Sequence, residues 1–217
     1  MHQRLLLTLL AFCLCTILFS QEPKLILPLG LASIPTDALF SPDGKKIVTA
    51  SIDGTVQLWD AFAGNMLADL KGHKNISSIQ FSPACPDDPI GGKKNLMASG
   101  DGTVIIWDVF TTNLLIEIKA HNSWLNSAAF SLDGKKIVTA SRDSTAKIWD
   151  AANGNLLVVL KGHKNYLYSA QFSPDGKKVV TASFDHTAKI WDVATGNLLA
   201  DLKGHSNMLL AAEFSPA

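Results

Sequence analysis

The segment KKIVTASRDSTAKIWD (residues 135–150) determines the architecture, because the chain contains it in four versions. The other copies are KKIVTASIDGTVQLWD (residues 45–60), KKNLMASGDGTVIIWD (residues 93–108) and KKVVTASFDHTAKIWD (residues 177–192). The tryptophans of the four copies are spaced 48, 42 and 42 residues apart. A period of this size indicates a repeat architecture, in which each copy forms one structural unit.

Each unit is predicted to contain four short strands joined by turns. In the third unit the turn residues are those of Ser-Leu-Asp-Gly, Asp-Ser and Asn-Gly-Asn, and the four strands between them are residues 125–130, 136–141, 145–149 and 156–160. Polar and apolar residues alternate in the third of these strands, as expected for a half-buried strand. No segment after residue 20 has a long 3.6-residue apolar period, so the sequence predicts an all-β fold.

Composition narrows the classes of function. The chain has 217 residues, of which 47% are hydrophobic, and a formal net charge of 0. This is enough apolar material for a core, and it gives no basic surface for nucleic acid. Beyond residue 20 the only cysteine is Cys85, so no internal disulfide is expected there. The sequence has no phosphate-binding glycine loop and no metal-ligand spacing, and we expect no cofactor and no metal.

The first twenty residues differ from the rest of the chain. Arg4 gives a positive start, residues 5–19 are apolar apart from two threonines, and a polar stretch begins at Ser20. This pattern is typical of a secretory signal peptide with cleavage near Ser20. It predicts a secreted or periplasmic protein. The alternative is a membrane anchor at residues 5–19, although a membrane span needs about 20 residues.

With these repeats the chain resembles the WD40 repeat family. The resemblance rests on Trp-Asp pairs at 59–60, 107–108, 149–150 and 191–192, on Gly-His pairs at 72–73, 162–163 and 204–205, and on Ala120-His121 as a variant. It implies a β-propeller of four-stranded antiparallel blades. The implied organisation is a signal peptide (1–20), a leader strand (21–35) and a propeller region (36–217), with units at about 36–73, 74–121, 122–163 and 164–205 and a partial unit at 206–217.

In this family a buried network typically links the repeat histidine to a hydroxyl, the turn aspartate and the tryptophan. The resemblance therefore implies a structural role for His73, His121, His163, His205, Asp53, Asp101, Asp143, Asp185, Ser51, Ser99, Ser141, Ser183, Trp59, Trp107, Trp149 and Trp191. In two units the hydroxyl stays open, because Thr139 and Thr181 are alternatives to Ser141 and Ser183. The first unit has Leu31 where a histidine is expected, so its network should be incomplete. An active site normally occurs once, whereas this set recurs, and we expect no catalytic residue in it.

Function is expected where the copies differ. The third residue after each repeat histidine is Ile76, Trp124, Tyr166 or Met208, and the residues beside the turn aspartates vary as well. In propellers of this family such positions lie near one rim, and aromatic residues often anchor partners. The candidate rim for a protein or peptide partner is therefore Trp124, Tyr166, Arg142, Phe184 and His186. Packing between blades is the alternative for Trp124 and Tyr166, and an ordinary exposed turn is the alternative for His186.

The sequence thus predicts an exported, non-enzymatic scaffold for protein interaction. The alternatives are the sensor or regulatory region of a larger exported enzyme, a truncated propeller fragment without a function of its own, and an enzyme built on the propeller. The extra loop at residues 84–92 is either a recognition loop or a tolerated insertion. Four units are fewer than the seven most common in the family. We favour a fragment of a longer protein over a homodimer that completes one ring or a ring of four blades.

Overall fold

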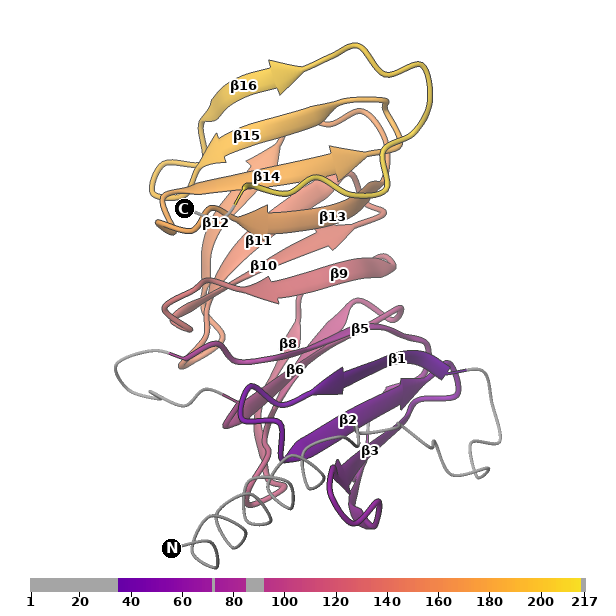
Figure 1. The fold of residues 1–217 in the computed structure, drawn as a ribbon. Helices are drawn as coiled ribbons and strands as arrows, with labels where there is room; N and C mark the ends of the chain where they lie inside the picture. Colours follow the sequence, from indigo (N-terminus) through magenta and orange to yellow (C-terminus); the bar gives the residue numbers. More distant parts are fainter. Residues whose placement is uncertain (1–34, 72, 85–91, 216–217) are drawn as a thin grey trace, which may run out of the picture. The chain divides into compact units, whose positions relative to one another are not determined.

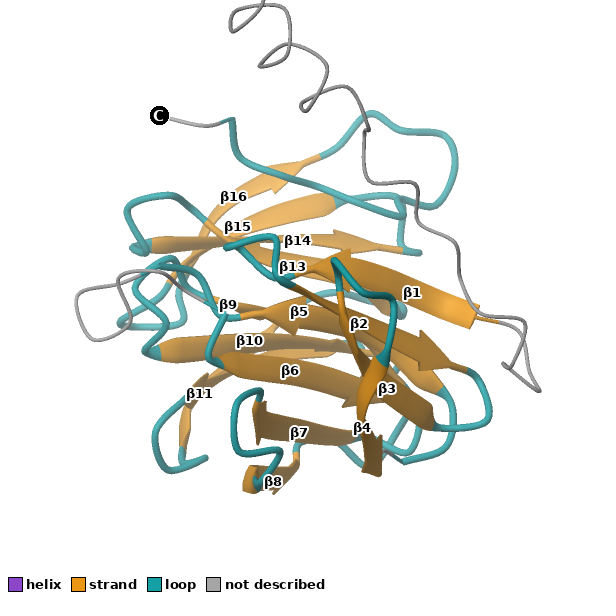
Figure 2. Ribbon diagram, turned by 60° about the horizontal axis from the view of Figure 1, so that its bottom comes forward, coloured by secondary structure: helices purple, strands orange, loops and turns teal. Residues whose placement is uncertain are grey.

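The computed structural model describes residues 35–71, 73–84 and 92–215, and these form four sheets of four strands each (Figure 1). No helix occurs in these ranges (Figure 2). All four sheets belong to one compact unit, residues 31–217. The prediction of an all-β fold built from four-stranded antiparallel blades is confirmed.

Each sheet is one blade, and its strands follow one another in chain order. The first blade holds β1 (Pro35–Phe40), β2 (Lys46–Ser51), β3 (Thr55–Asp60) and β4 (Met66–Lys71). The second holds β5 (Ile76–Phe81), β6 (Lys94–Ser99), β7 (Thr103–Asp108) and β8 (Leu114–Lys119). The third holds β9 (Leu125–Phe130), β10 (Lys136–Ser141), β11 (Thr145–Asp150) and β12 (Leu156–Lys161). The fourth holds β13 (Leu167–Phe172), β14 (Lys178–Ser183), β15 (Ala188–Asp192) and β16 (Leu198–Leu202).

The turn between the first two strands of a blade is fixed by a serine hydroxyl. In the third blade Ser131 Oγ donates to Asp133 Oδ1 over 2.5 Å, and the backbone N–H of Lys136 donates to Ser131 Oγ over 2.9 Å. The first and fourth blades repeat this arrangement at Ser41 and Ser173. Side chains of this kind satisfy backbone groups that the turn would otherwise leave without partners. The turns inferred from the repeated motif therefore lie where the sequence predicts them.

The hydrophobic core lies between consecutive blades. Trp149 and Phe130 of the third blade pack against Leu96 and Ile106 of the second, and all four side chains are buried. Equivalent clusters join the first blade to the second and the third to the fourth. Because each blade buries its apolar face on its neighbour, the fold depends on the succession of units.

The first strands of successive blades are in contact, β1 with β5, β5 with β9 and β9 with β13. No comparable contact joins β1 to β13 among the strands that the structure describes. The first blade accordingly leaves one face open: Phe40 is 45% exposed, whereas its counterparts Phe81 and Phe130 are 7% and 6% exposed. The contacts therefore do not show the closed ring of four blades that the sequence left as an alternative.

The C-terminal segment departs from the repeated pattern. A partial unit with a first strand was predicted at residues 206–217, but residues 203–215 contain no strand. A first strand pairs with the second strand of its own blade, and no such strand follows in the described chain. The signal peptide, the leader strand except Pro35, and most of the loop at 84–92 lie outside the described residues. In the ranges that the structure describes there is no helix long and apolar enough to cross a membrane.

Candidate functional site

Two complete hydrogen-bond networks lie inside the third and fourth blades. His121 Nδ1 is 2.7 Å from Asp143 Oδ2, and its Nε2 is 2.8 Å from Thr139 Oγ1. Trp149 Nε1 donates to the same hydroxyl over 3.1 Å. In the fourth blade His163, Asp185, Thr181 and Trp191 repeat this geometry, with distances of 2.8, 2.7 and 2.9 Å. In these two blades the structure brings together the histidine, aspartate and tryptophan that the family resemblance grouped.

A neutral imidazole completes this chain of hydrogen bonds in one direction. The indole N–H donates to the threonine oxygen, the threonine hydroxyl donates to Nε2, and Nδ1–H donates to the carboxylate. Burial lowers the pKa of His121 below its ordinary value, against the opposing effect of Asp143. Burial raises the pKa of Asp143, but hydrogen bonds from Thr145 and His121 outweigh it, so that pKa is lowered. Both imidazole nitrogens are occupied, so neither is free to take a proton from a substrate.

The hydroxyl in these networks belongs to threonine. Ser141 and Ser183, the other candidates, bind the loop that leads into their own blade instead. Ser141 Oγ donates to the carbonyl oxygen of Trp124 over 3.0 Å, and Ser183 Oγ donates to that of Tyr166, also over 3.0 Å. Ser99 binds the equivalent loop in the second blade, through the carbonyl oxygen of Lys74. These serines therefore position the rim loops.

The second blade has an interrupted network. His73 Nδ1 lies 2.6 Å from Asp101 Oδ2, but Met97 stands where the third and fourth blades have threonine. Trp107 Nε1 is consequently buried without a hydrogen-bond partner. The methionine was visible in the aligned copies, and it is the signal that the sequence interpretation missed.

The remaining network residues fall at the two ends of the array. In the first blade Trp59 Nε1 donates to Thr49 Oγ1 over 2.9 Å, and Asp53 binds the backbone and hydroxyl of Thr55. Ser51 is buried in β2. The position of Leu31 lies outside the described residues. His205 is exposed and lines a cavity of about 310 Å³ over the fourth blade.

At the rim, four of the five candidate side chains form one continuous cluster. The guanidinium carbon of Arg142 lies 4.8 Å from the ring centroid of Trp124 and 6.0 Å from that of Tyr166. The Tyr166 and Phe184 rings are 6.1 Å apart, and Phe184 lies 5.7 Å from Tyr168. Contacts of this kind, between two aromatic rings or between an aromatic ring and a cation, are favourable. The cluster joins the third blade to the fourth.

The two aromatic anchors are placed differently. Trp124 is half-buried and lies against the backbone of Gly100 in the second blade, where a side chain would collide with the indole. Tyr166 is 46% exposed and Tyr168 is 41% exposed. His186 is exposed at a positive φ of 68°, in the turn position that glycine occupies in the first two blades, and no ring contact links it to the cluster. The exposed surface is thus formed by the tyrosines and Arg142, with Trp124 as their support.

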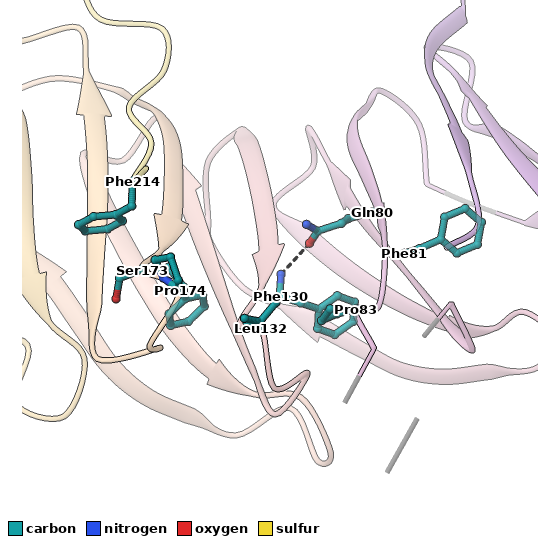
Figure 3. Close-up of a pocket in the computed structure, with 9 residues that line it drawn as sticks. Gln80, Phe81, Pro83, Phe130, Leu132, Ser173, Pro174 and Phe214 are labelled. Atoms are coloured by element: carbon teal, nitrogen blue, oxygen red, sulfur yellow. Dashed lines mark hydrogen bonds between the residues drawn. The ribbon is translucent and has the colours of Figure 1, made fainter. Parts of the chain in front are cut away.

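The opposite ends of the first strands surround an apolar pocket of about 470 Å³. It is lined by Gln80, Phe81, Pro83, Phe130, Leu132, Phe172, Ser173, Pro174 and Phe214, most of which are labelled in Figure 3. Gln80 Oε1 accepts a hydrogen bond from the backbone N–H of Phe130 over 2.7 Å, drawn as the dashed line in Figure 3. None of these lining side chains is titratable, so the pocket offers no acid or base. Among the described residues no group of three His, Cys, Asp or Glu side chains is placed to hold a metal ion.

Two features of the rim were not predicted from the sequence. Tyr168 was not singled out, because it lies inside a strand whose alternation makes it an ordinary outward-facing residue. The stacking of Arg142 on Trp124 joins residues 18 positions apart in the sequence, and it depends on the pairing of β9 with β10. The spacing of the repeats alone does not show this contact.

The model of one protein family, described as WD domain, G-beta repeat, matches residues 31–60, 64–108, 112–150 and 154–192. Among curated proteins, the chain is similar to WD repeat-containing protein 82 of Drosophila melanogaster, with 42% identity over 52 residues. It is also similar to the Notchless protein homolog of Arabidopsis thaliana (39% over 54 residues) and to Denticleless protein homolog A of Xenopus laevis (40% over 47 residues). These matches cover 23%, 25% and 21% of the chain, and only 16%, 11% and 7% of the three relatives.

Proposed function

Because the chain belongs to the WD40 repeat family, we propose that it is a non-catalytic scaffold that binds a protein or peptide partner. One observation carries the proposal. In the second, third and fourth blades the histidine and aspartate that resemble catalytic groups are engaged with each other, and in the third and fourth blades both nitrogens of the imidazole are occupied. The same arrangement recurs from blade to blade, as a structural device does and a single active site does not.

The binding surface that we propose is the cluster of Trp124, Arg142, Tyr166 and Phe184. Its support is geometric: these side chains touch in series at the junction of two blades. Tyrosine, tryptophan and arginine are the residues most enriched where binding energy concentrates at protein interfaces. Tyr166 and Tyr168 expose ring surface that the fold itself does not use. His186 borders the cluster in sequence but has no ring contact with it.

Tyr166→Ala tests this surface. A display library of random peptides would be selected on the full chain, and the strongest peptide would be synthesised for affinity measurements. We expect the substitution to weaken binding about tenfold or more, as truncation of an aromatic anchor does. The thermal midpoint should stay close to that of the unchanged chain, because Tyr166 is nearly half exposed.

Leu132→Ala is the matched control, since Leu132 is 59% exposed at the opposite end of the third blade. It should leave the peptide affinity unchanged. The reverse result, with binding lost in Leu132→Ala and kept in Tyr166→Ala, would place the partner at the other end of the first strands and contradict the proposal.

Export is a second part of the proposal, and it rests on the sequence of residues 1–20. Their positive start and apolar core fit a signal peptide, and the chain that follows holds a single cysteine. The measurement is the mass of the mature N-terminus after expression with the native leader. We expect a product that begins near residue 21. An intact leader in the cell fraction would argue against export, and an intact leader in the membrane fraction would support the anchor at residues 5–19. The homodimer likewise stays a prediction, to be tested by solution mass.

A further inference from the structure

The rim cluster is built around a single arginine. Arg142 is the only arginine in residues 35–215, where all other basic side chains are lysine or histidine. It stands between two aromatic rings, Trp124 and Tyr166. An arginine side chain differs from lysine in being flat, so its face stacks on rings while its edge presents a fork of donors. That fork matches a carboxylate with two parallel hydrogen bonds.

Most of the N–H donors of the Arg142 side chain have no acceptor among the described residues. Its Nε donates to Asn126 Oδ1 over a long 3.4 Å, and no ion pair joins Arg142 to a carboxylate among the described residues. The turn aspartates of the third and fourth blades are engaged elsewhere. Asp143 accepts hydrogen bonds from the backbone and hydroxyl of Thr145 and from His121. Asp185, in the next blade, is held in the same way by its own network. The positive charge of Arg142 is therefore not neutralised within its own blade.

The two loops that carry the cluster are held by backbone hydrogen bonds. The N–H of Arg142 donates to the carbonyl oxygen of Trp124 over 2.9 Å, and the N–H of Phe184 donates to that of Tyr166 over 2.9 Å. The serines that end β10 and β14 donate to the same two carbonyl oxygens. A site that is ordered before the ligand arrives loses less entropy on binding, which favours affinity.

An apolar surface lies directly beside the charge. The rings of Tyr166, Phe184 and Tyr168 follow one another at 6.1 and 5.7 Å, and both tyrosines are more than 40% exposed. A ligand that satisfies the whole cluster must bring a negative group to Arg142 and an apolar side chain to these rings. An extended peptide with an acidic residue near an aromatic or aliphatic one has this chemistry.

We infer that the rim binds an acidic peptide segment, in which an Asp or Glu carboxylate pairs with Arg142 and a neighbouring apolar side chain packs on Tyr166 and Tyr168. This inference rests on the proposed function and specifies its ligand. A nucleic acid would also bring negative charge and stacking bases, but the chain has a formal net charge of 0 and no basic run. Binding of nucleic acid depends on many phosphate contacts, which such a surface does not supply.

The test uses the strongest peptide selected on the full chain by random-peptide display, labelled with fluorescein. Its dissociation constant is measured by anisotropy, together with that of an analogue in which each Asp or Glu becomes Asn or Gln. On the unchanged chain we expect the analogue to bind about tenfold more weakly or worse, as loss of a charged hydrogen-bond pair implies. On Arg142→Gln the two peptides should bind within about twofold of each other. Arg142→Lys should restore only part of the difference, because lysine keeps the charge and loses the fork.

Lys135→Gln is the control for net charge, since it removes one positive charge at an exposed position in the turn just before β10, away from the rim. It should keep the full difference between the two peptides. If the neutral analogue binds the unchanged chain as well as the acidic peptide does, the acidic ligand is wrong, and the proposed function stands as long as Tyr166→Ala still weakens binding. If no peptide is selected, or if binding is indifferent to Tyr166, both are wrong. The inference would also be overturned if fluorescent single-stranded DNA bound the unchanged chain more tightly than the peptide does and lost this binding in Arg142→Gln.

Discussion

The threonine at the centre of each complete network bonds to two other polar side chains of the blade interior. Thr139 is fully buried and serves both His121 Nε2 and Trp149 Nε1. Thr139→Val keeps the shape but leaves two buried polar groups without a partner, at about 1–3 kcal/mol each. We expect the free energy of unfolding in urea to fall by about 2–6 kcal/mol, the sum for the two groups. Thr49→Val is the control, because Thr49 serves only Trp59 among the described residues, and it should cost about 1 kcal/mol. Equal losses in the two variants would contradict the network.

Protonation of the same histidines predicts how stability depends on pH. Burial lowers the pKa values of His121 and His163 in the folded chain. The unfolded chain then binds protons that the folded chain does not, so stability falls as pH drops below about 6.5 toward the folded pKa. Asp143 and Asp185, whose pKa values are also lowered, should continue the loss below about pH 4. We expect the thermal midpoint to decrease between pH 7 and pH 5.

The control for this pH dependence is a pair of histidine substitutions. His121→Gln should flatten the decrease between pH 7 and pH 5, because it removes one of the titrating groups. His186→Asn should leave it unchanged, since His186 is exposed and asparagine tolerates its positive φ. A midpoint that is constant or rises on acidification would show that the networks do not hold neutral histidines.

Among the elements, the tight turn after the second strand fixes how closely one blade meets the next. Gly102 has a φ of 87°, and a Cβ there would overlap the carbonyl oxygen of His121. Gly44 has a φ of 68° and nothing near its Cβ position. Gly44→Ala should therefore cost about 1–2 kcal/mol from backbone strain alone, and Gly102→Ala should cost more. Urea unfolding of the two variants separates the cost of backbone strain from the cost of the steric overlap with His121. A Gly102→Ala loss no larger than that of Gly44→Ala would mean that the loop of His121 moves away freely.

At the scale of strands and turns, some features of the blades were predictable from the sequence and others were not. Strands and turns were predictable because alternation and turn residues recur in every copy. The choice between Thr139 and Ser141 was not, because two hydroxyls two residues apart lie on the same face of β10 and only distance separates their roles. The stacking of Arg142 on Trp124 needs the register of two strands, which the sequence pattern does not give. The missing hydrogen bond of Trp107 Nε1 was predictable from Met97, since this copy lacks the hydroxyl that the others carry.

For the whole molecule, the repeat period predicted a repeat architecture, and the resemblance to the WD40 family implied that each unit is a four-stranded blade. Each unit buries its apolar face on the next. The number of blades that complete a ring was not predictable, since closure depends on contacts between units that need not be near in sequence. The contacts that the structure shows between first strands, along the series β1, β5, β9 and β13, join consecutive blades. The structure also separates two kinds of residue that the repeats mix: those held inside the blades by the networks, and those that vary at the rim.

One binding experiment tests this division of roles between the rim and the networks. The affinity of the Tyr166→Ala chain for the selected peptide is compared with that of the unchanged chain, at a temperature where both are folded. We expect a loss of about tenfold or more with an unchanged melting midpoint, because the rim binds the peptide and the networks hold the fold. Unchanged affinity, or a collapse of the melting midpoint in Tyr166→Ala, would contradict this division of roles.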